Sequence, residues 1–295
     1  MMNLQDLMRQ VRLIELKTTK LVSGMFAGMY MSSFKGRGIE FDEIREYEPG
    51  DDVRAIDWNV TARTGRAFIK RFVEEREMTV MVLVDVSGSS DFGTAVKLKR
   101  ELEAELCAAL ALSAVRNNDR VGLVLFTDQI ERFLPPRKGR NHVMQMIRTL
   151  LTTEPRHRGT NLTVALDFVN NVVSGKALVF IVSDFRTADN WVRPLRVTAR
   201  RHDVVAVQIE DPRETKLPAV GLLRLQDAET GREILVDLRN KRVREQFEKR
   251  AAEQKSAHAA ELRALGVDTI TLRTDQRYAD ALQAFFRNRI RRKEK

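Results

Sequence analysis

The sequence predicts an α/β protein with a mostly parallel sheet flanked by helices. Short runs rich in Val, Leu and Ile alternate along most of the chain with longer amphipathic stretches. Continuously apolar runs are typical of strands buried on both faces of a sheet, as in parallel sheets. Alternation with helices favours parallel pairing, because parallel neighbours need a long crossover between them. The expected strands are 79–84, 121–126, 176–183, 204–209 and 268–272.

Helices are expected between these strands. Helical periodicity is clearest at 97–115, where Leu98, Leu102, Leu106 and Leu110 recur along one face. A short edge strand is expected at 129–134, ended by a pair of prolines that cannot donate to a ladder. The remaining helices are expected at 142–151, 161–173, 191–201, 240–265 and from about Asp275, a suitable capping residue, onward.

Two regions depart from this alternation. Strand-like runs at 221–226 and 233–238 flank a polar turn, so we expect a β-hairpin inserted at about 217–238. The first part of the chain opens with an amphipathic helix at 4–22 and continues with dense charges of both signs among aromatic residues. A disordered tail would lack those aromatics. We therefore expect a folded, charged module at 1–77 and a main domain at 78–295.

Composition restricts the class of protein. The chain has a single cysteine, Cys107, and this excludes an internal disulfide or a cysteine-rich metal site. Cys107 lies in an apolar helical run. The longest apolar runs fall far short of the roughly 20 residues that span a bilayer, and no targeting segment is evident. We expect a cytoplasmic protein without a membrane span. The net charge of +10 is not accompanied by aromatic residues that would stack on bases, which disfavours nucleic acid as a partner.

Oxygen-bearing side chains follow or precede several predicted elements at one edge of the sheet. In an open α/β sheet, ligands bind beside the carboxyl ends of the strands, where these side chains lie. Hydroxyl and carboxylate oxygens in a shell of low charge suit Mg²⁺, with Mn²⁺ or Ca²⁺ as alternatives. The sequence thus predicts one divalent-cation site with these ligands: Asp85, Ser87, Ser89, Thr160 and Asp184.

The spacing of the first three ligands carries part of this prediction. Asp85-x-Ser87-x-Ser89 follows a buried strand directly, and Gly88 lets the loop curl so that both serines face one point. Taken alone, this spacing also fits an Asx turn with serines that cap the next helix. Mg²⁺ prefers six oxygens and keeps some waters. A coordination position would therefore stay open for a carboxylate of a partner protein.

The alternative from another class is a metal-dependent phosphotransfer enzyme of the haloacid dehalogenase type, with Asp85 as its nucleophile. Such enzymes need a second Asp two residues later as a general acid, and this chain has Ser87 there. The sequence also lacks a Gly-x-x-x-x-Gly-Lys-Ser/Thr loop for nucleotides and a Gly-x-Ser-x-Gly hydrolase motif. We expect a binding module without catalytic residues or a small-molecule substrate.

Two resemblances add to this interpretation. The five predicted ligands resemble the metal-ion-dependent adhesion site of von Willebrand factor A domains, and the resemblance covers the chain from Met78 onward. The hairpin insertion and the first module resemble the bacterial domain-of-unknown-function family 58. The runs that carry the second resemblance are Gly-Arg-Gly-Ile-Glu-Phe at 36–41, Tyr-Glu-Pro-Gly-Asp-Asp-Val-Arg at 47–54 and Ile-Asp-Trp at 56–58.

The resemblance implies a von Willebrand factor A-like fold and a partnership with a MoxR-type AAA+ ATPase. It further implies assistance in the maturation or assembly of an unknown client protein. The charges of the first module then have two interpretations that stay open: a face that docks the ATPase, or an internal network of salt bridges, which would need partial burial to contribute. The residues concerned are Arg37, Glu40, Arg45, Asp51, Asp52, Arg54 and Asp57.

Overall fold

The computed structural model describes residues 4–22, 26–34, 39–74, 77–93, 97–187 and 189–293. Its body is built on six strands: β3 (Thr79–Asp85), β4 (Arg120–Phe126), β5 (Ile130–Arg137), β6 (Ala177–Ser183), β7 (Asp203–Glu210) and β10 (Asp268–Arg273). They form one sheet in the order β10-β7-β6-β3-β4-β5, in which only β5 pairs antiparallel. The predicted α/β class, a mostly parallel sheet, is thereby confirmed.

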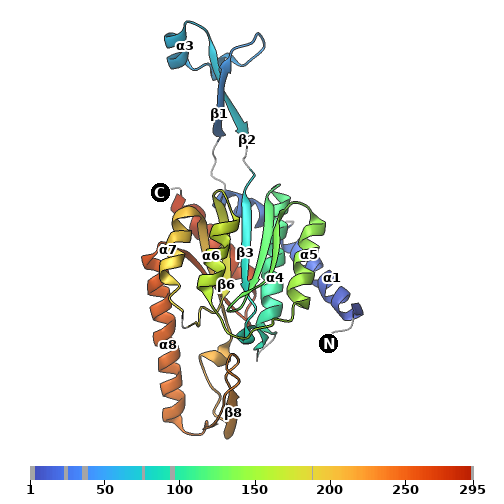
Figure 1. Cartoon of the computed structure of the whole chain (residues 1–295), viewed down its shortest axis with the longest axis vertical. Coiled ribbons are helices and arrows are strands. Elements are labelled where there is room, and N and C mark those ends of the chain that lie inside the picture. Colours follow the sequence, from blue (N-terminus) through green and yellow to red (C-terminus); the bar gives the residue numbers. More distant parts are fainter. Residues whose placement is uncertain are drawn as a thin grey trace.

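Helices cover both faces of the sheet (Figure 1). The helices on one face are α1 (Leu4–Leu21), α2 (Ala27–Phe34), α4 (Lys99–Arg116), α5 (Arg140–Thr152) and α9 (Tyr278–Lys293). The helices on the other face are α6 (Leu162–Val172), α7 (Val192–Arg201) and α8 (Lys241–Ala264). Among the described residues, no helix is at once long enough and apolar enough to cross a membrane.

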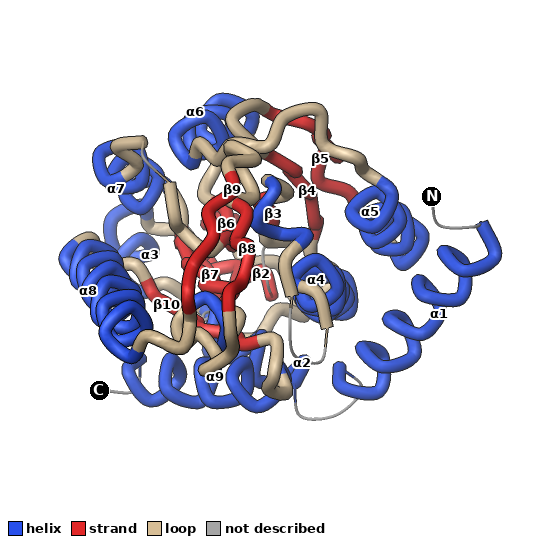
Figure 2. Tube along the Cα trace, turned by 90° about the horizontal axis from the view of Figure 1, so that it is seen from below, coloured by secondary structure: helices blue, strands red, loops and turns tan. Residues whose placement is uncertain are grey.

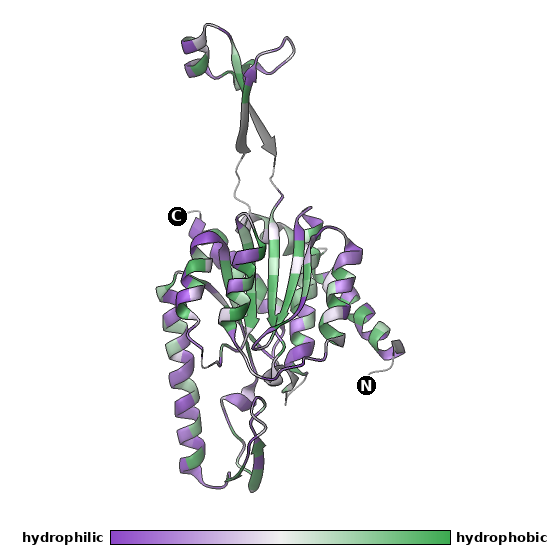
Figure 3. Ribbon diagram, viewed as in Figure 1, coloured by the Kyte–Doolittle hydropathy of each residue, from purple (hydrophilic) through white to green (hydrophobic). Residues whose placement is uncertain are grey.

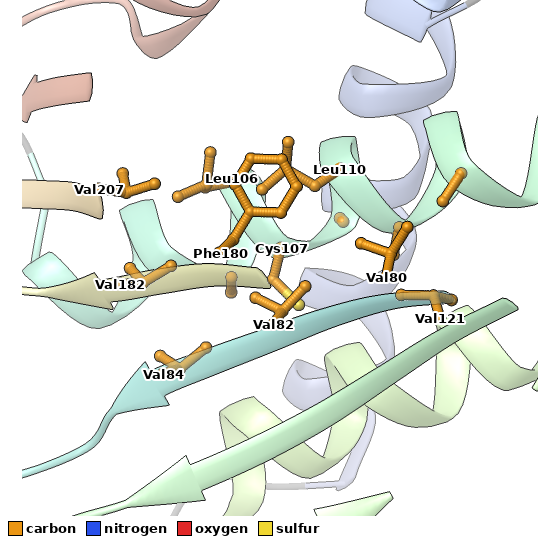
Figure 4. Packing of buried hydrophobic residues seen from close by; sticks show 14 of the residues in the cluster. Val80, Val82, Val84, Leu106, Cys107, Leu110, Val121, Phe180, Val182 and Val207 are labelled. Atoms are coloured by element: carbon orange, nitrogen blue, oxygen red, sulfur yellow. The ribbon is translucent and has the colours of Figure 1, made fainter. Parts of the chain in front are cut away.

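Burial on both faces explains the uninterrupted apolar strands. Val80, Val82 and Val84 of β3 belong to the cluster shared with α4, whereas Met81 and Leu83 belong to the cluster on the other face. Successive side chains of a strand point to opposite faces, so a strand covered on both sides must be apolar at every position. Figure 4 shows the first of these clusters, in which valines of the strands meet the leucines of α4.

Helix α4 supplies the central packing surface of that face. Leu102, Leu106 and Leu110 are fully buried, as the periodicity predicts. Cys107 lies among them, and burial raises the pKa of its thiol to about 12. The cysteine is therefore a small core residue and not a reactive thiolate.

The first helices pack against the body. An aromatic cluster joins α2 to α9 and the sheet: the Phe34 ring lies 5.8 Å from the Phe286 ring and 5.7 Å from the Phe180 ring, centroid to centroid. Phe26 contacts Phe286 at 5.0 Å, and Tyr30 is fully buried. This packing places residues 4–34 with the α/β body, whereas the sequence analysis grouped them with the charged residues that follow.

Residues 39–74 form a separate unit beyond the amino ends of the parallel strands (Figure 1). It consists of β1 (Ile39–Glu46), the 3₁₀ turn η2 (Val53–Ala55), α3 (Trp58–Thr64) and β2 (Phe68–Glu74), with β1 and β2 paired antiparallel. The start of the family motif, residues 36–38, lies outside the described residues.

The inserted hairpin is confirmed at the opposite end of the sheet. Strands β8 (Leu222–Gln226) and β9 (Glu233–Asp237) pair antiparallel. Figure 2, which looks along the sheet from this end, places the hairpin across β3 and β6, and Figure 1 places it below the same edge. The hairpin therefore lies at the carboxyl ends of the parallel strands, where the predicted ligands are.

Two expectations about boundaries need correction. Strand β5 continues through the proline pair to Arg137, which an edge strand permits because one side of its ladder is free. Helix α9 begins at Tyr278, and the Asp275 carboxylate binds the guanidinium of Arg273 at 2.9 Å. An ion pair with its neighbour thus takes the place of the expected helix cap.

We predict that Phe34→Ala lowers the free energy of unfolding by about 3–5 kcal/mol, because it removes a buried ring from the junction of α2, α9 and the sheet. The matched control is Trp58→Ala on α3, where the side chain is 68% exposed; its effect should stay within about 0.5 kcal/mol. Denaturant unfolding of both variants checks this. Equal losses would contradict the assignment of residues 4–34 to the core of the body.

Candidate metal centre

The loop after β3 is organised around a buried carboxylate. Asp85 is 1% exposed. It accepts a hydrogen bond from the Ser87 backbone N–H at 3.0 Å and one from Ser183 Oγ at 2.7 Å. Ser90 Oγ donates to the Asp85 carbonyl at 2.8 Å. These bonds curl the chain into a 3₁₀ turn, η3 (Gly88–Asp91), directly at the carboxyl end of β3.

The two predicted serine ligands meet in this turn. Ser87 Oγ and Ser89 Oγ lie 3.2 Å apart, so both hydroxyls face the same point. Ser87 is buried, and Ser89 is partly accessible. This arrangement is the one expected from Asp-x-Ser-x-Ser spacing around a glycine.

Asp184 and Thr160 approach from neighbouring elements. Asp184 follows β6, which pairs with β3, and lies close enough to Asp85 to act on its ionisation. Thr160 precedes Asn161, whose side chain caps α6 by accepting from the Val164 N–H. The Thr160 hydroxyl donates to the carboxylate of Glu229 at 2.9 Å. The structure therefore brings all five predicted side chains to one edge of the sheet, and the Thr160 hydroxyl there contacts Glu229 of the hairpin.

Negative charge accumulates here. Burial, and then the Asp184 carboxylate, raise the pKa of Asp85 to about 7, although hydrogen bonds from Ser183 and Ser87 oppose the shift. Burial and the Asp85 charge likewise hold the pKa of Glu103, on α4, well above its usual range. Glu103 Oε1 accepts from Ser90 Oγ, whereas its buried Oε2 has no hydrogen-bond partner among the described residues.

One basic side chain balances part of this charge. The Lys99 ammonium, 2% exposed, binds Asp184 at 3.1 Å and also Glu214. Burial opposes its charge, but the two carboxylates together raise the pKa of Lys99 above its usual value. Within the described ranges, Asp85 forms no ion pair. An additional cation beside Asp85 would therefore compensate a charge that the protein itself leaves uncompensated.

The donor set fits a hard divalent cation. Three hydroxyls and two carboxylates are oxygen ligands of the kind that Mg²⁺ binds together with water. No group of three or more His, Cys, Asp and Glu side chains close enough to hold a metal occurs within the described residues. A cation at this edge would thus depend on the hydroxyls of Ser87, Ser89 and Thr160. The ligand assignment itself stays a prediction.

Several residues of the site were not indicated by the sequence, Lys99, Glu214 and Glu229 among them. Lys99 lies in the first turn of a helix and Glu214 in a 3₁₀ turn (η4, Pro212–Glu214), and each belongs to a charged stretch without a distinctive motif. Glu229 lies in the hairpin turn, which was identified as a turn but not as part of the site. The spacing Asp-x-Glu-x-Gly in that turn was the available signal, since a charged turn placed at the carboxyl edge can reach the ligands.

The comparisons with known proteins identify the family. Residues 43–257 match the family described as protein of unknown function DUF58. The chain is 35% identical over 285 residues to uncharacterized protein Rv1480 of Mycobacterium tuberculosis, covering 95% of this chain and 89% of the relative. It is 27% identical over 107 residues to uncharacterized protein YeaD of Bacillus subtilis, covering 36% of this chain and 25% of that one. The chain belongs to the DUF58 family.

Solved structures with low sequence identity are also similar to this chain. Protein BatB of Bacteroides thetaiotaomicron has a TM-score of 0.48 at 16% identity, covering 74% of this chain and all of that one. The SpRpn10 VWA domain has a TM-score of 0.38 at 10% identity, covering 70% of this chain and 94% of that domain. At these identities no function is carried over.

The raised pKa of Asp85 predicts a pH dependence of the metal-free protein. In the unfolded chain this carboxyl ionises near pH 3.8, and in the folded chain near 7. The unfolded state therefore loses this proton first, so stability from this group is present below about pH 4 and is lost as the pH rises through 7. The expected loss is on the order of a few kcal/mol.

Thermal unfolding from pH 5 to 8 with a chelator present measures this effect. Asp85→Asn keeps the shape of the side chain and cannot ionise, so its melting temperature should fall less over the same range. A wild-type protein that is equally stable at both ends, or an unchanged slope in the variant, would contradict the shift.

Proposed function

We propose that this chain is a metal-dependent protein-binding module that holds Mg²⁺ through Asp85, Ser87, Ser89, Thr160 and Asp184. When bound, the cation would attract a carboxylate of a partner protein to its remaining coordination position. Asp85 and Asp184 would supply the compensating charge, and the serine and threonine hydroxyls would keep that charge low. A shell with few anionic ligands leaves the metal electrophilic enough to bind an outside carboxylate.

The observation that carries the proposal is the enclosed Asp85 carboxylate. It is buried at the carboxyl edge of the sheet, beside two serine hydroxyls and Asp184, and it lacks a basic partner among the described residues. A buried charge of this kind is costly unless it is paired or binds a metal. The alternative, a phosphotransfer enzyme of the haloacid dehalogenase type, is not supported by the family match. Such an enzyme needs an Asp as general acid two residues after Asp85, and this chain has Ser87 there.

The direct test is calorimetric titration with Mg²⁺. We predict that the wild type binds the ion and that Asp85→Ala abolishes detectable binding, because the most enclosed carboxylate of the site is lost. Asp85→Ala should still fold, since it removes a buried charge. Asp167→Ala, which removes an exposed carboxylate from α6, is the matched control and should bind as the wild type does. Equal binding by all three proteins would refute the site.

We further propose that the module acts in the cytoplasm with a MoxR-type AAA+ ATPase, in the maturation or assembly of other proteins. The unit of residues 39–74 is our candidate for the docking element. It stands at the end of the body opposite the metal centre (Figure 1), so one protein could contact the ATPase at one end and a client at the other.

The charged residues described in this unit differ in whether they stabilise its own turns or leave their side chains available to a partner. Arg45 binds Asp51 at 2.6 Å, and the Asp52 and Asp57 carboxylates accept backbone N–H groups that cap η2 and α3. These groups stabilise local turns. The backbone N–H of Arg54 takes part in such a cap, and Arg54 itself is exposed. Val53 and Trp58, close to it in the sequence, are 60% and 68% exposed.

We predict that Arg54→Glu weakens binding to a purified MoxR-type ATPase from the same organism without changing the melting temperature. The reversed charge alters the exposed surface and leaves the cap intact. Arg250→Glu, on the exposed side of α8, makes the same change in net charge far from the unit and should bind normally. A fallen melting temperature with unchanged binding would favour the structural interpretation of these charges.

A further inference from the structure

The tip of the β8–β9 hairpin is seated on the loop of the candidate metal centre. The backbone of Gly88 lies so close to the hairpin that a Cβ added there would be 2.2 Å from the Ala228 carbonyl oxygen. Such a distance is far inside van der Waals contact, so only glycine fits between the two serines and the hairpin. The Gly88 N–H donates to the Arg158 carbonyl at 3.0 Å, which fixes this loop against the segment that carries Thr160.

The hairpin presents a carboxylate to the predicted ligands. Glu229, the residue after Ala228, is half-buried and accepts the hydrogen bond from Thr160 Oγ1 at 2.9 Å. The carboxylate of Asp184, a second predicted ligand, lies within electrostatic reach of it. The turn therefore holds Glu229 against Thr160.

Hydrogen bonds within the turn at 227–231 stabilise its conformation. The Asp227 carboxylate accepts the N–H groups of Glu229 and Thr230 at 3.0 and 2.8 Å. The Gly231 N–H donates to the Asp227 carbonyl, and Gly231 has a φ of 70°, which favours glycine. These local hydrogen bonds define the backbone of the turn that carries Glu229.

Without a cation, this arrangement brings another carboxylate near Asp85 and Asp184. Asp184 is paired with Lys99, whereas Asp85 has no ion pair within the described ranges. The hydrogen bond from Thr160 alone offsets only part of the repulsion. A divalent cation would make the same geometry favourable, because Glu229 would then face a positive charge.

We propose that Glu229 becomes an internal ligand of the metal centre once a cation is bound: Asp85, Asp184 and Glu229 do not form a metal-holding group among the described residues, and the cation would draw the Glu229 carboxylate in from its place on Thr160. Glu229 would then supply the carboxylate that a partner protein otherwise provides, and the hairpin must withdraw before a partner can bind. This inference rests on the proposed function, since it requires that the site hold a cation. It identifies the hairpin insertion as the element that regulates access to the site.

The remainder of the hairpin is suited to withdrawal. Leu222, Ile234 and Leu235 are 60–67% exposed, so these side chains do not anchor it in the core. Figure 3 shows hydrophobic residues on this hairpin, which extends below the body. A cavity separates its inner side from the body, lined by Arg100 and Arg158 of the body and by Gln226 of the hairpin. Segments with few buried apolar contacts open at low free-energy cost, so the tip can withdraw while Leu238, fully buried directly after β9, holds the base of the hairpin.

The test compares the wild type with Glu229→Gln and with Glu233→Gln, a matched change on the same hairpin. Glu233 is 47% exposed at its side chain and pairs only with Arg224 among the described residues. Mg²⁺ affinity is measured by calorimetry, and amide hydrogen exchange over residues 222–237 is measured with and without saturating Mg²⁺. Melting temperatures in the presence of a chelator verify that each variant is folded.

We expect Mg²⁺ to slow amide exchange in the hairpin of the wild type and of Glu233→Gln. Glu229→Gln should bind Mg²⁺ about 10- to 100-fold more weakly, and its hairpin should not be protected by the ion. In Glu229→Ala, bound Mn²⁺ should relax solvent protons more strongly than in the wild type, because water replaces the lost carboxylate.

The outcomes separate this inference from the proposed function. If the wild type and Glu229→Gln bind Mg²⁺ equally and their hairpins are equally protected, Glu229 is not a ligand, whereas the metal-dependent module still stands. If the wild type binds no Mg²⁺, the proposed function fails and the internal ligand fails with it.

Discussion

The buried carboxylate of Asp85, at the end of the central strand β3, is the group around which the candidate site at the carboxyl edge of the sheet is arranged. Asp85 is almost completely buried, and the described surroundings provide hydrogen bonds from a serine hydroxyl and a backbone N–H but no ion pair. Transfer of a charge from water into such a place is costly unless it is protonated, paired or bound to a metal. The raised pKa of Asp85 expresses the first solution, and a divalent cation would supply the third. The loop, the neighbouring Asp184 and the buried Lys99 are arranged around this one requirement.

The two excursions from the α/β body lie at opposite ends of its sheet, and their positions follow from the chain topology. Residues 39–74 lead into the amino end of β3, so the unit that they form extends beyond that edge. The hairpin follows β7 in the chain and therefore starts from the carboxyl edge of the sheet, where it reaches the loop after β3. The proposed division of labour, with an ATPase at one end and a client carboxylate at the other, uses this separation. The sheet between them connects the two ends.

Much of the body could be predicted from periodicity. The apolar strands and the leucine spacing of α4 reflect burial on both faces, which acts on every residue of an element and leaves a repeated signal. Helix α2 and α3 escaped prediction because they are short and carry few repeats of any pattern. The grouping of residues 4–34 also differed, since nothing in a helical pattern tells which neighbour its apolar face will meet. Phe34 and Phe286 are far apart in the sequence, and only packing shows that their rings are in contact.

The α/β class, the inserted hairpin and the oxygen-bearing side chains at strand ends follow from local spacing and alternation, which can be recognised in the sequence directly. The ion pair of Lys99 with Asp184, the burial of Glu103 behind the loop and the contact of Glu229 with Thr160 depend on how the folded chain packs. These contacts join residues that are distant in the chain, and their energies depend on burial and on the distance between charges. Neither burial nor the distance between two charges can be obtained from the order of the residues. The electrostatics of the site therefore depends on how the folded chain places the strands and the hairpin.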